Sequence, residues 1–563
     1  MTAQPYLVDA PPGSASHAVL GPSLSAKARG AVFTKPAVVD FMLDLVGYTS
    51  GVPLWSRRLL EPACGGGGFL LAAARRLVES WRAGDRATDD SVLDEAIRAV
   101  EVDVATYEQT RNALTEALTR LGLPELSARR LTRAWLVNAD FLEWDHDGVF
   151  DYVVGNPPYV RPEAIPGWQL ARYRSKFGTM AGRADLYVPF FERGLGLLAP
   201  HGRLSYICAD AWTKNDYGRA LRDLITRKFS LVAYVDMYGL DAFEDSVGAY
   251  PSITVIAADR AQPARTATAT SVQPDDLRRV AERLTTPSPD DRPVTVPGGG
   301  APWLLRTTRE HDAIRDLESR EGTIEQVGCR VGIGVATGAD GVFISDFEGL
   351  DVEDSRKLPL AVNRDVCQGV FTWHGSGVVN PWREDGGLVD LRDYPRLGAY
   401  LRPHHDALAR RHTAKRDPAA RWYKTIDRIV PDLTWQPKLL VPDIRGDGDA
   451  IAFDRGSAYP HHNLYYITST TWDLQALQAL LRSGIAHLFI DAYAVRVGGG
   501  YLRFQAQYLR RLRIPRWDSL EPAVALELME AGRADAKVHP RLIERAYRVE
   551  PGSLSFLRDW SQP

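Results

Sequence analysis

The sequence has few cysteines, no long apolar run and little net charge, and each shortage excludes a class of protein. Cys64, Cys208, Cys329 and Cys367 form no CxxC pair, so neither a zinc ribbon nor a disulfide framework is indicated. No apolar run reaches the ~18 residues of a membrane span, and the N-terminus lacks the basic and apolar segments of a secretion signal. We therefore expect a protein of the reduced cytoplasm that has no membrane partner.

A GxxxxGK[ST] motif is also absent, which disfavours a P-loop ATPase. The net charge of −3 gives no sign of a nucleic-acid partner. Charge is nevertheless unevenly spread, because residues 391–430 hold eight Arg and two Lys against four Asp and no Glu. Such a stretch can neutralise phosphates, but taken alone it is more typical of solvated helix faces.

From about residue 28 to 260, apolar runs bounded by turns alternate with amphipathic helical patterns. This alternation predicts an α/β fold with a mostly parallel sheet, in which ligands bind at the carboxyl ends of the strands. The predicted strands are 57–63, 96–103, 151–157, 202–210, 230–237 and 251–258.

The 563 residues suit two or three domains. We predict a loose N-terminal tail over 1–27 and a first domain over 28–284. A segment dense in Pro, Gly and Asp, 285–302, predicts a linker. The remainder, 303–563, lacks a regular alternation and predicts a second domain of α+β type.

The segment LLEPACGGGGFLLAAARRL predicts a strand, a glycine-rich turn and a helix. Gly65 to Gly68 let the backbone approach a ligand closely, although such a turn serves many nucleotides or none. Glu61 is more specific, because a carboxylate there can meet a cationic amino group and would repel a phosphate. Glu101 ends the next strand, where a carboxylate accepts hydrogen bonds from ribose hydroxyls. Asp103 is an alternative, but such a residue more often caps the following helix.

The segment VNADFLEWD adds two side chains suited to a nucleoside. Asp140 can accept a hydrogen bond from an adenine amino group, and Phe141 can stack on its ring. Either residue alone is also explained as a turn cap or as core. Their order after Glu61 and Glu101, on successive elements, favours a nucleoside site.

The segment FDYVVGNPPYVRP is the most informative. Two prolines fix the backbone and remove two amide donors, so nearby carbonyl groups are free to accept other hydrogen bonds. The side-chain oxygen of Asn156 and a carbonyl beside it fit the two hydrogens of an exocyclic amine. Gripping both hydrogens localises the nitrogen lone pair for in-line attack on a sulfonium methyl, without a covalent enzyme intermediate. Tyr159 can stack on the substrate ring.

A base inside a duplex must be flipped out to reach such a pocket, and it then needs stacking partners. Phe243 is the predicted second partner. Ordinary core packing is the alternative for Phe243, and Tyr238 or Tyr250 could do the same work.

In order, GAVFTKPAVVDFM, EPACGGGGFL, AVEVD, NADFLEW, FDYVVGNPPYV and a late aromatic before PSITVI resemble the TaqI-type adenine-N6 DNA methyltransferases. The resemblance covers about residues 28–260 and implies a Rossmann-like catalytic domain that precedes a target-recognition domain. One departure is Gly66, where many relatives carry a side chain.

The resemblance implies a role for each matching position. Thr34 would hold the carboxylate of the methionine moiety of S-adenosylmethionine, and Glu61 its amino group. Asn156 and the Pro157 carbonyl would hold the target amine, between Tyr159 and Phe243. The positions matching the cofactor site are Thr34, Glu61, Ala63, Gly65, Glu101, Asp140, Phe141 and Asn156, and no metal is implied.

The later half resembles the family's DNA-recognition domain more faintly, in 331–344, 421–424, 436–446 and 498–515. With it, the basic stretch becomes a candidate for phosphate contacts. The resemblance implies double-stranded DNA as partner, a chain that acts as a monomer on it, and a separate restriction endonuclease for the same site.

Other readings remain open. Methylation of cytosine carbon uses a thiolate that usually follows proline, and no cysteine here does. Cytosine-N4 methylation uses similar geometry, although Asn before Pro-Pro-Tyr favours adenine. Enzymes that methylate RNA guanine or protein glutamine also carry this tetrapeptide. A DNA-binding subunit without catalysis fits poorly, because every expected catalytic residue type is present. The hypothesis of a fused nuclease is based only on residues 430–438, which superficially resemble a nuclease metal site. Gln436 stands where such a site needs a carboxylate.

Overall fold

The computed structural model divides the chain into two compact units, Met1–Thr307 and Thr308–Pro563. It describes residues 32–84, 89–146, 148–244, 251–260, 264–286, 293–305, 309–414, 421–445, 450–494 and 502–557. The predicted tail, 1–27, and Tyr250 lie outside the described residues.

The first unit is built on an eight-stranded sheet in the order β3-β2-β1-β4-β5-β7-β6-β8. Neighbouring strands run parallel except at β7, which is antiparallel to both β5 and β6. The strands are β1 (Leu59–Glu61), β2 (Ile97–Glu101), β3 (Leu136–Asn138), β4 (Phe150–Gly155), β5 (Leu198–Ala209), β6 (Ser230–Asp236), β7 (Pro251–Ala257) and β8 (Arg265–Thr268).

This sheet confirms the predicted α/β fold and all six predicted strands. Sequence analysis missed two strands. β3 has three residues and follows a helix without a turn, and β8 is the polar tetrapeptide RTAT, so neither forms an apolar run. Both are edge strands, where such short segments are expected.

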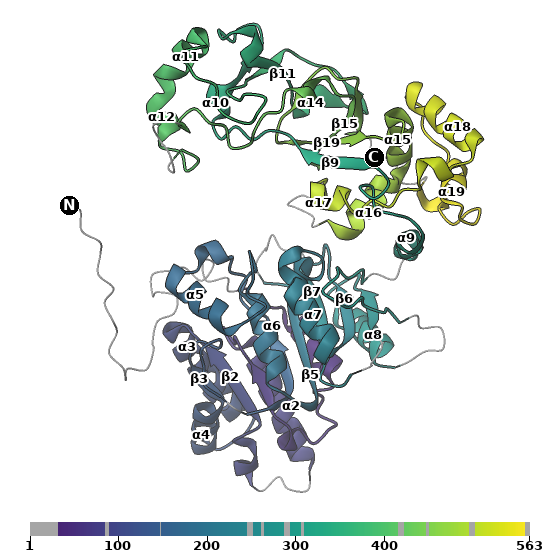
Figure 1. Cartoon of the computed structure of the whole chain (residues 1–563). Helices are drawn as coiled ribbons and strands as arrows, with labels where there is room; N and C mark the ends of the chain where they lie inside the picture. Colours follow the sequence, from purple (N-terminus) through teal and green to yellow (C-terminus); the bar gives the residue numbers. More distant parts are fainter. Residues whose placement is uncertain are drawn as a thin grey trace, which may run out of the picture. The chain divides into compact units, whose positions relative to one another are not determined.

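Helices cover both faces of this sheet, and Figure 1 shows α6 and α7 in front of it. One hydrophobic core contains residues of α1, α2, α3, α4 and α8, and the other contains residues of α5, α6 and α7. The helices are α1 (Pro36–Val46), α2 (Gly68–Ala83), α3 (Val104–Arg120), α4 (Glu125–Trp135), α5 (Gly167–Lys176), α6 (Tyr187–Gly196), α7 (Arg219–Lys228) and α8 (Pro274–Thr285).

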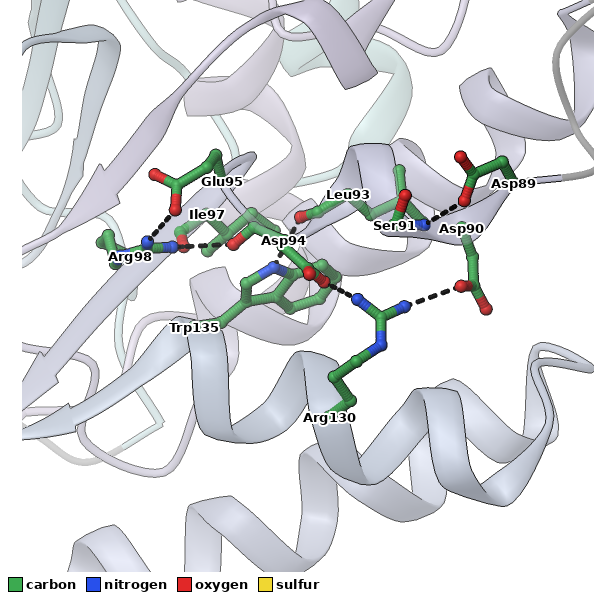
Figure 2. Close-up of polar contacts among 10 residues, drawn as sticks. All are labelled: Asp89, Asp90, Ser91, Leu93, Asp94, Glu95, Ile97, Arg98, Arg130 and Trp135. Carbon is green, nitrogen blue, oxygen red and sulfur yellow. Dashed lines mark hydrogen bonds and ion pairs between the residues drawn. The ribbon is translucent and has the colours of Figure 1, made fainter.

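Polar contacts fasten α4 to the loop that enters β2 (Figure 2). Arg130 pairs with both Asp90 (2.6 Å) and Asp94. The buried Trp135 donates its indole N–H to the Leu93 carbonyl at 2.8 Å. These contacts fix the outer end of the sheet at β2 and β3, and thereby the positions of the residues that follow those strands.

The predicted linker, 285–302, differs from the structure. Thr285 ends α8, and the described residues from 293 onward pack on the first unit. The buried Arg222 side chain donates to the Gly300 and Ala301 carbonyls, and Trp303 is fully buried against Trp212. The division of the chain therefore falls after Thr307. A composition rich in Pro and Gly correctly predicts an irregular backbone here. The buried Trp303 nevertheless anchors this segment to the first unit.

The second unit is of α+β type, with four-stranded sheets β10-β14-β11-β18 and β17-β15-β19-β9 and the pairs β12-β13 and β16-β20. Its strands are β9 (Cys329–Ile333), β10 (Ile344–Asp346), β11 (Lys357–Ala361), β12 (Val366–Cys367), β13 (Val370–Phe371), β14 (Ser376–Val379), β15 (Lys438–Pro442), β16 (Ile444–Arg445), β17 (Ala452–Asp454), β18 (Tyr459–Pro460), β19 (Leu464–Ser469) and β20 (Leu502–Arg503). Its helices include α9 (Arg309–Arg320), α10 (Asp340–Phe343), α11 (Pro395–Leu401), α12 (His405–Ala409), α14 (Asp432–Trp435), α15 (Leu474–Leu480), α16 (Ala486–Tyr493), α17 (Ala506–Leu509), α18 (Pro522–Arg533) and α19 (Pro540–Tyr547).

Throughout the described ranges, no helix is both long enough and apolar enough to span a bilayer.

Candidate active site

A cavity of about 420 Å³ opens in the first unit where four neighbouring parallel strands end. Glu61 ends β1 and Glu101 ends β2, while Asp140 follows β3 and Asn156 follows β4. All four side chains line the cavity, because the carboxyl ends of parallel strands share one edge of the sheet. Its size is in the range of small-molecule sites.

The structure brings together all eight positions matched to a cofactor site and leaves three target-side positions outside the cavity wall. The positions that line it are Thr34, Glu61, Ala63, Gly65, Glu101, Asp140, Phe141 and Asn156. The positions absent from its lining are Pro157, Tyr159 and Phe243.

The glycine-rich turn forms one wall. Gly65 has φ of +50°, a conformation that favours glycine, and Gly67, at φ +85°, is the N-cap residue of α2. The Gly65 N–H donates to the Glu101 carboxylate at 2.9 Å, and its carbonyl accepts from the Thr110 hydroxyl at 2.6 Å. The turn is therefore held by the strand and helix beside it.

Two carboxyl groups that line the cavity, Glu61 and Glu101, are close enough to influence each other. Glu61 is 1% exposed, and one of its oxygens has no hydrogen-bond partner among the described residues. Burial, reinforced by the neighbouring Glu101 carboxylate, raises the pKa of Glu61 well above its ordinary value. No Lys, Arg or His among the described residues lines the cavity. A buried carboxylate without a cation is costly, so the site is suited to a cationic ligand.

Glu101 also accepts from the Asp103 backbone at 2.8 Å. Asp103 itself caps α3, because its carboxylate accepts from the backbone N–H of Thr106 at 3.0 Å and from its hydroxyl at 2.7 Å. The structure thus confirms the capping interpretation of Asp103.

Asp140 is held from two sides. It accepts from the Leu142 backbone at 3.0 Å and from the Tyr173 hydroxyl at 2.8 Å, and Gln169 donates to Tyr173 in turn. Burial raises the pKa of Asp140, against the lowering effect of the Tyr173 hydrogen bond. Phe141 lines the cavity but is also core, since it is 2% exposed and packs on Phe190.

Asn156 has its amide group oriented by a distant segment. Its NH₂ donates to the Val32 carbonyl at 2.9 Å and to the Thr34 hydroxyl at 3.2 Å. Its side-chain oxygen is buried and has no hydrogen-bond partner among the described residues. Using both donors internally leaves one acceptor available for a ligand in the cavity.

The two predicted stacking residues touch each other. The Tyr159 and Phe243 rings lie edge to face, with centroids 6.2 Å apart and planes at 82°. Tyr159 donates to the Ile207 carbonyl at 3.4 Å, and Phe243 is 4% exposed. A base can stack between these rings only after one of them turns. The Tyr238 backbone N–H donates to the Asp236 carboxylate at 3.0 Å, and Tyr238 is not among the residues that line the cavity.

Sequence reasoning missed Phe33, Tyr173 and Glu244, which also line the cavity. Phe33 could have been noticed beside Thr34, and its ring lies over the glycine-rich turn. A Cβ on Gly66 would come within 3.3 Å of that ring, which gives a physical reason for glycine at this departure from the family pattern. Tyr173 and Glu244 carry no local signal.

The lysine of the rejected nuclease pattern has a structural role. Lys438 and Asp454 form an ion pair of 2.7 Å with both side chains fully buried, and Lys438 also donates to the Thr434 and Gln436 carbonyls. Its ammonium is therefore committed to the fold.

Two arginines of the predicted basic stretch bind other residues of the second unit. Arg411 donates to the Thr337, Trp422 and Lys424 carbonyls, and Arg396 pairs with Asp351. Residues 415–420 lie outside the described residues.

Comparison with known proteins gives the family. Residues 85–243 match the model of the Eco57I restriction-modification methylase family. The type II methyltransferase M.PaeR7I of Pseudomonas aeruginosa is 49% identical over 539 residues, which are 94% of each chain. M.XhoI of Xanthomonas vasicola is 47% identical over 517 residues, covering 90% of this chain and 94% of that protein.

Among solved structures, the type IIL restriction-modification enzyme MmeI in complex with DNA is similar in fold. Its TM-score is 0.56 at 11% identity, over 94% of this chain and 74% of that one. The sequence relatives carry the assignment: this chain belongs to the type II DNA methyltransferases of restriction-modification systems.

Proposed function

We propose that this chain transfers a methyl group from S-adenosylmethionine to the N6 amino group of an adenine flipped out of duplex DNA. The observation that carries the proposal is the arrangement of Asn156, whose donors are both used internally and whose buried oxygen is left for a ligand amine.

The cavity fits the cofactor. Its carboxylates, Glu61, Glu101, Asp140 and Glu244, and the absence of a lining cation among the described residues suit a ligand with an ammonium and a sulfonium group. When bound, S-adenosylmethionine supplies an electrophilic methyl group. Glu61 would bind its amino group, Glu101 its ribose hydroxyls and Asp140 its adenine amine. Thr34 would hold its carboxylate, while Ala63 and Gly65 would offer backbone contacts and Phe141 an aromatic surface.

On the target side, the Asn156 oxygen and the Pro157 carbonyl accept the two hydrogens of the amine. This grip orients the nitrogen lone pair and stabilises the positive charge that develops there as the new bond forms. Tyr159 and Phe243 stack on the flipped base after their present contact opens.

The second unit is proposed to recognise the target sequence in duplex DNA, with Arg and Lys side chains on phosphates and others on base edges. The proposal also includes that the chain acts on DNA as a monomer. It further includes a separate restriction endonuclease that cleaves the same DNA sequence.

Nucleoside analysis tests the reaction. Duplex DNA of varied sequence is incubated with the protein and S-adenosylmethionine, digested, and examined by mass spectrometry. We expect N6-methyladenine. Detection of N4-methylcytosine would instead identify cytosine as the target base. Methyl groups found only in RNA or peptide substrates would overturn the proposal.

A further inference from the structure

Two segments of the second unit bring together one carboxylate and two imidazoles. Asp340 begins α10, and His461 and His462 lie between β18 and β19. Backbone hydrogen bonds join the segments, because the Val335 N–H donates to the Pro460 carbonyl at 2.9 Å and the His462 N–H donates to the Val335 carbonyl at 3.0 Å. These backbone hydrogen bonds therefore hold the two segments that carry the three side chains next to each other.

The spacing of the side-chain atoms fits metal ligands. One ligand atom from each of the three residues lies within 4.8 Å of the other two. The His461 Nε2 and Asp340 Oδ2 atoms are 3.3 Å apart, longer than the usual N–H···O distance of about 2.9 Å. A tetrahedral site with bonds of about 2.0–2.1 Å has edges of about 3.3–3.4 Å. The observed separation matches such an edge.

The surroundings also support a metal. The Thr337 hydroxyl donates to Asp340 Oδ1 at 2.5 Å, which orients the carboxylate and leaves Oδ2 toward His461. His461 is 7% exposed, whereas Asp340 and His462 are exposed and give a path for entry. Within the ranges that the structure describes, no other set of three such side chains is arranged in this way.

We propose that Asp340, His461 and His462 bind one Zn²⁺ ion or a similar late first-row divalent cation, with solvent completing its coordination. One oxygen and two nitrogen ligands are a donor set that Zn²⁺ accepts readily. The ion joins the start of α10 to the β18–β19 connection, which are 121 residues apart in sequence, and so stabilises the folded second unit. The proposed role of the ion is structural, and the proposal assigns it no part in methyl transfer.

Zn²⁺ binding by the full-length protein tests this inference. Protein stripped with a chelator is titrated with Zn²⁺ in competition with a chromogenic chelator. We expect one equivalent bound with a micromolar or lower Kd, and a higher melting temperature with Zn²⁺ present. Asp340→Asn and His462→Ala should each weaken binding at least tenfold. His374→Ala removes another exposed histidine, one that contacts Asp365, and should leave binding unchanged.

X-ray absorption spectroscopy of the loaded protein identifies the ligands. Nitrogen and oxygen neighbours at about 2.0–2.1 Å support the site, whereas sulfur at about 2.3 Å would assign the ion to a cysteine and overturn it. Absence of stoichiometric binding, or equal binding by wild type, Asp340→Asn and His462→Ala, would also overturn it. Circular dichroism spectra and methyl-transfer activity are measured for each variant as controls for correct folding.

Discussion

The two ends of the Asn156 side-chain amide have different surroundings. The nitrogen is held by Val32 and Thr34, and the oxygen remains available inside the cavity. An asparagine that is fixed in this way does not need to reorganise when a ligand amine arrives, which is the advantage of preorganised hydrogen-bonding groups.

Asn156→Ala should lower kcat for methyl transfer by roughly 10²–10³-fold, the loss seen when one hydrogen bond to a developing charge is removed. Calorimetry should show S-adenosylmethionine binding reduced much less. Asn156→Asp keeps an acceptor and should lose less activity than the alanine variant. Equal activity of wild type and Asn156→Ala would contradict the proposed grip on the amine.

The raised pKa of Glu61 makes the stability of the folded chain depend on pH. Because burial raises the pKa of Glu61 in the folded chain, the unfolded chain loses this proton first as pH rises above about 4.3. The folded state then binds more protons than the unfolded state, so its stability falls with rising pH until the folded pKa is passed.

Glu61→Gln should therefore raise the melting temperature of the cofactor-free protein between pH 5 and 8 relative to wild type, and reduce its decline with pH. The same change should weaken S-adenosylmethionine binding, because the neutral amide loses the charge that meets an ammonium. Glu125→Gln, on an exposed ion pair with Arg129, is the control and should change neither property. An unchanged pH profile in Glu61→Gln would mean that this carboxyl is already ionised.

At the scale of elements, the glycine-rich turn depends on the segment before α1. The Thr34 backbone pairs with Phe243, and the Glu244 N–H donates to the Phe33 carbonyl at 2.9 Å. Phe33, which lies over the glycine-rich turn, and Phe243, the proposed stacking residue, are thus on two short segments that pair with each other. Under the proposed function, movement of Phe243 toward a flipped base would also shift Phe33 and Thr34, which line the cavity.

A fully buried ion pair, Lys438 with Asp454, joins β15 and β17 in the second unit. Lys438→Met should destabilise the protein by about 3–5 kcal/mol, because it leaves the Asp454 carboxylate buried without its partner. Urea denaturation followed by tryptophan fluorescence measures the change. Arg516→Ala breaks an exposed pair with Asp518 and should cost under about 1 kcal/mol. Similar losses in the free energy of unfolding for the two variants would show that the buried ion pair contributes no more to stability than the exposed one.

For the whole molecule, the net charge of −3 hides the local charge that a DNA-binding protein needs. Arg411 of the basic stretch binds carbonyl groups of the second unit itself, whereas Arg396 forms an exposed ion pair with Asp351, so under the proposed function Arg411 is not expected to contact phosphate.

DNA affinity should fall steeply with salt, since each neutralised phosphate releases counterions. A protein that contacts about six phosphates loses about 10³-fold between 50 and 200 mM salt. Fluorescence anisotropy with a labelled duplex measures this slope, and S-adenosylmethionine affinity measured over the same range should change little. A flat DNA curve would argue against phosphate contacts as the main source of affinity.

The sequence by itself determined six of the eight strands of the first unit, the order of the site residues and the chemistry they offer, because apolar periodicity and the backbone limits of Gly and Pro act locally. Only the tertiary structure decided which distant groups meet. Asn156 is oriented by residues 124 and 122 positions earlier, Asp140 is held by Tyr173 from α5, and Trp303 draws a loop of linker composition onto the first unit. Such contacts depend on how packed elements are juxtaposed, and no local pattern of residues encodes that.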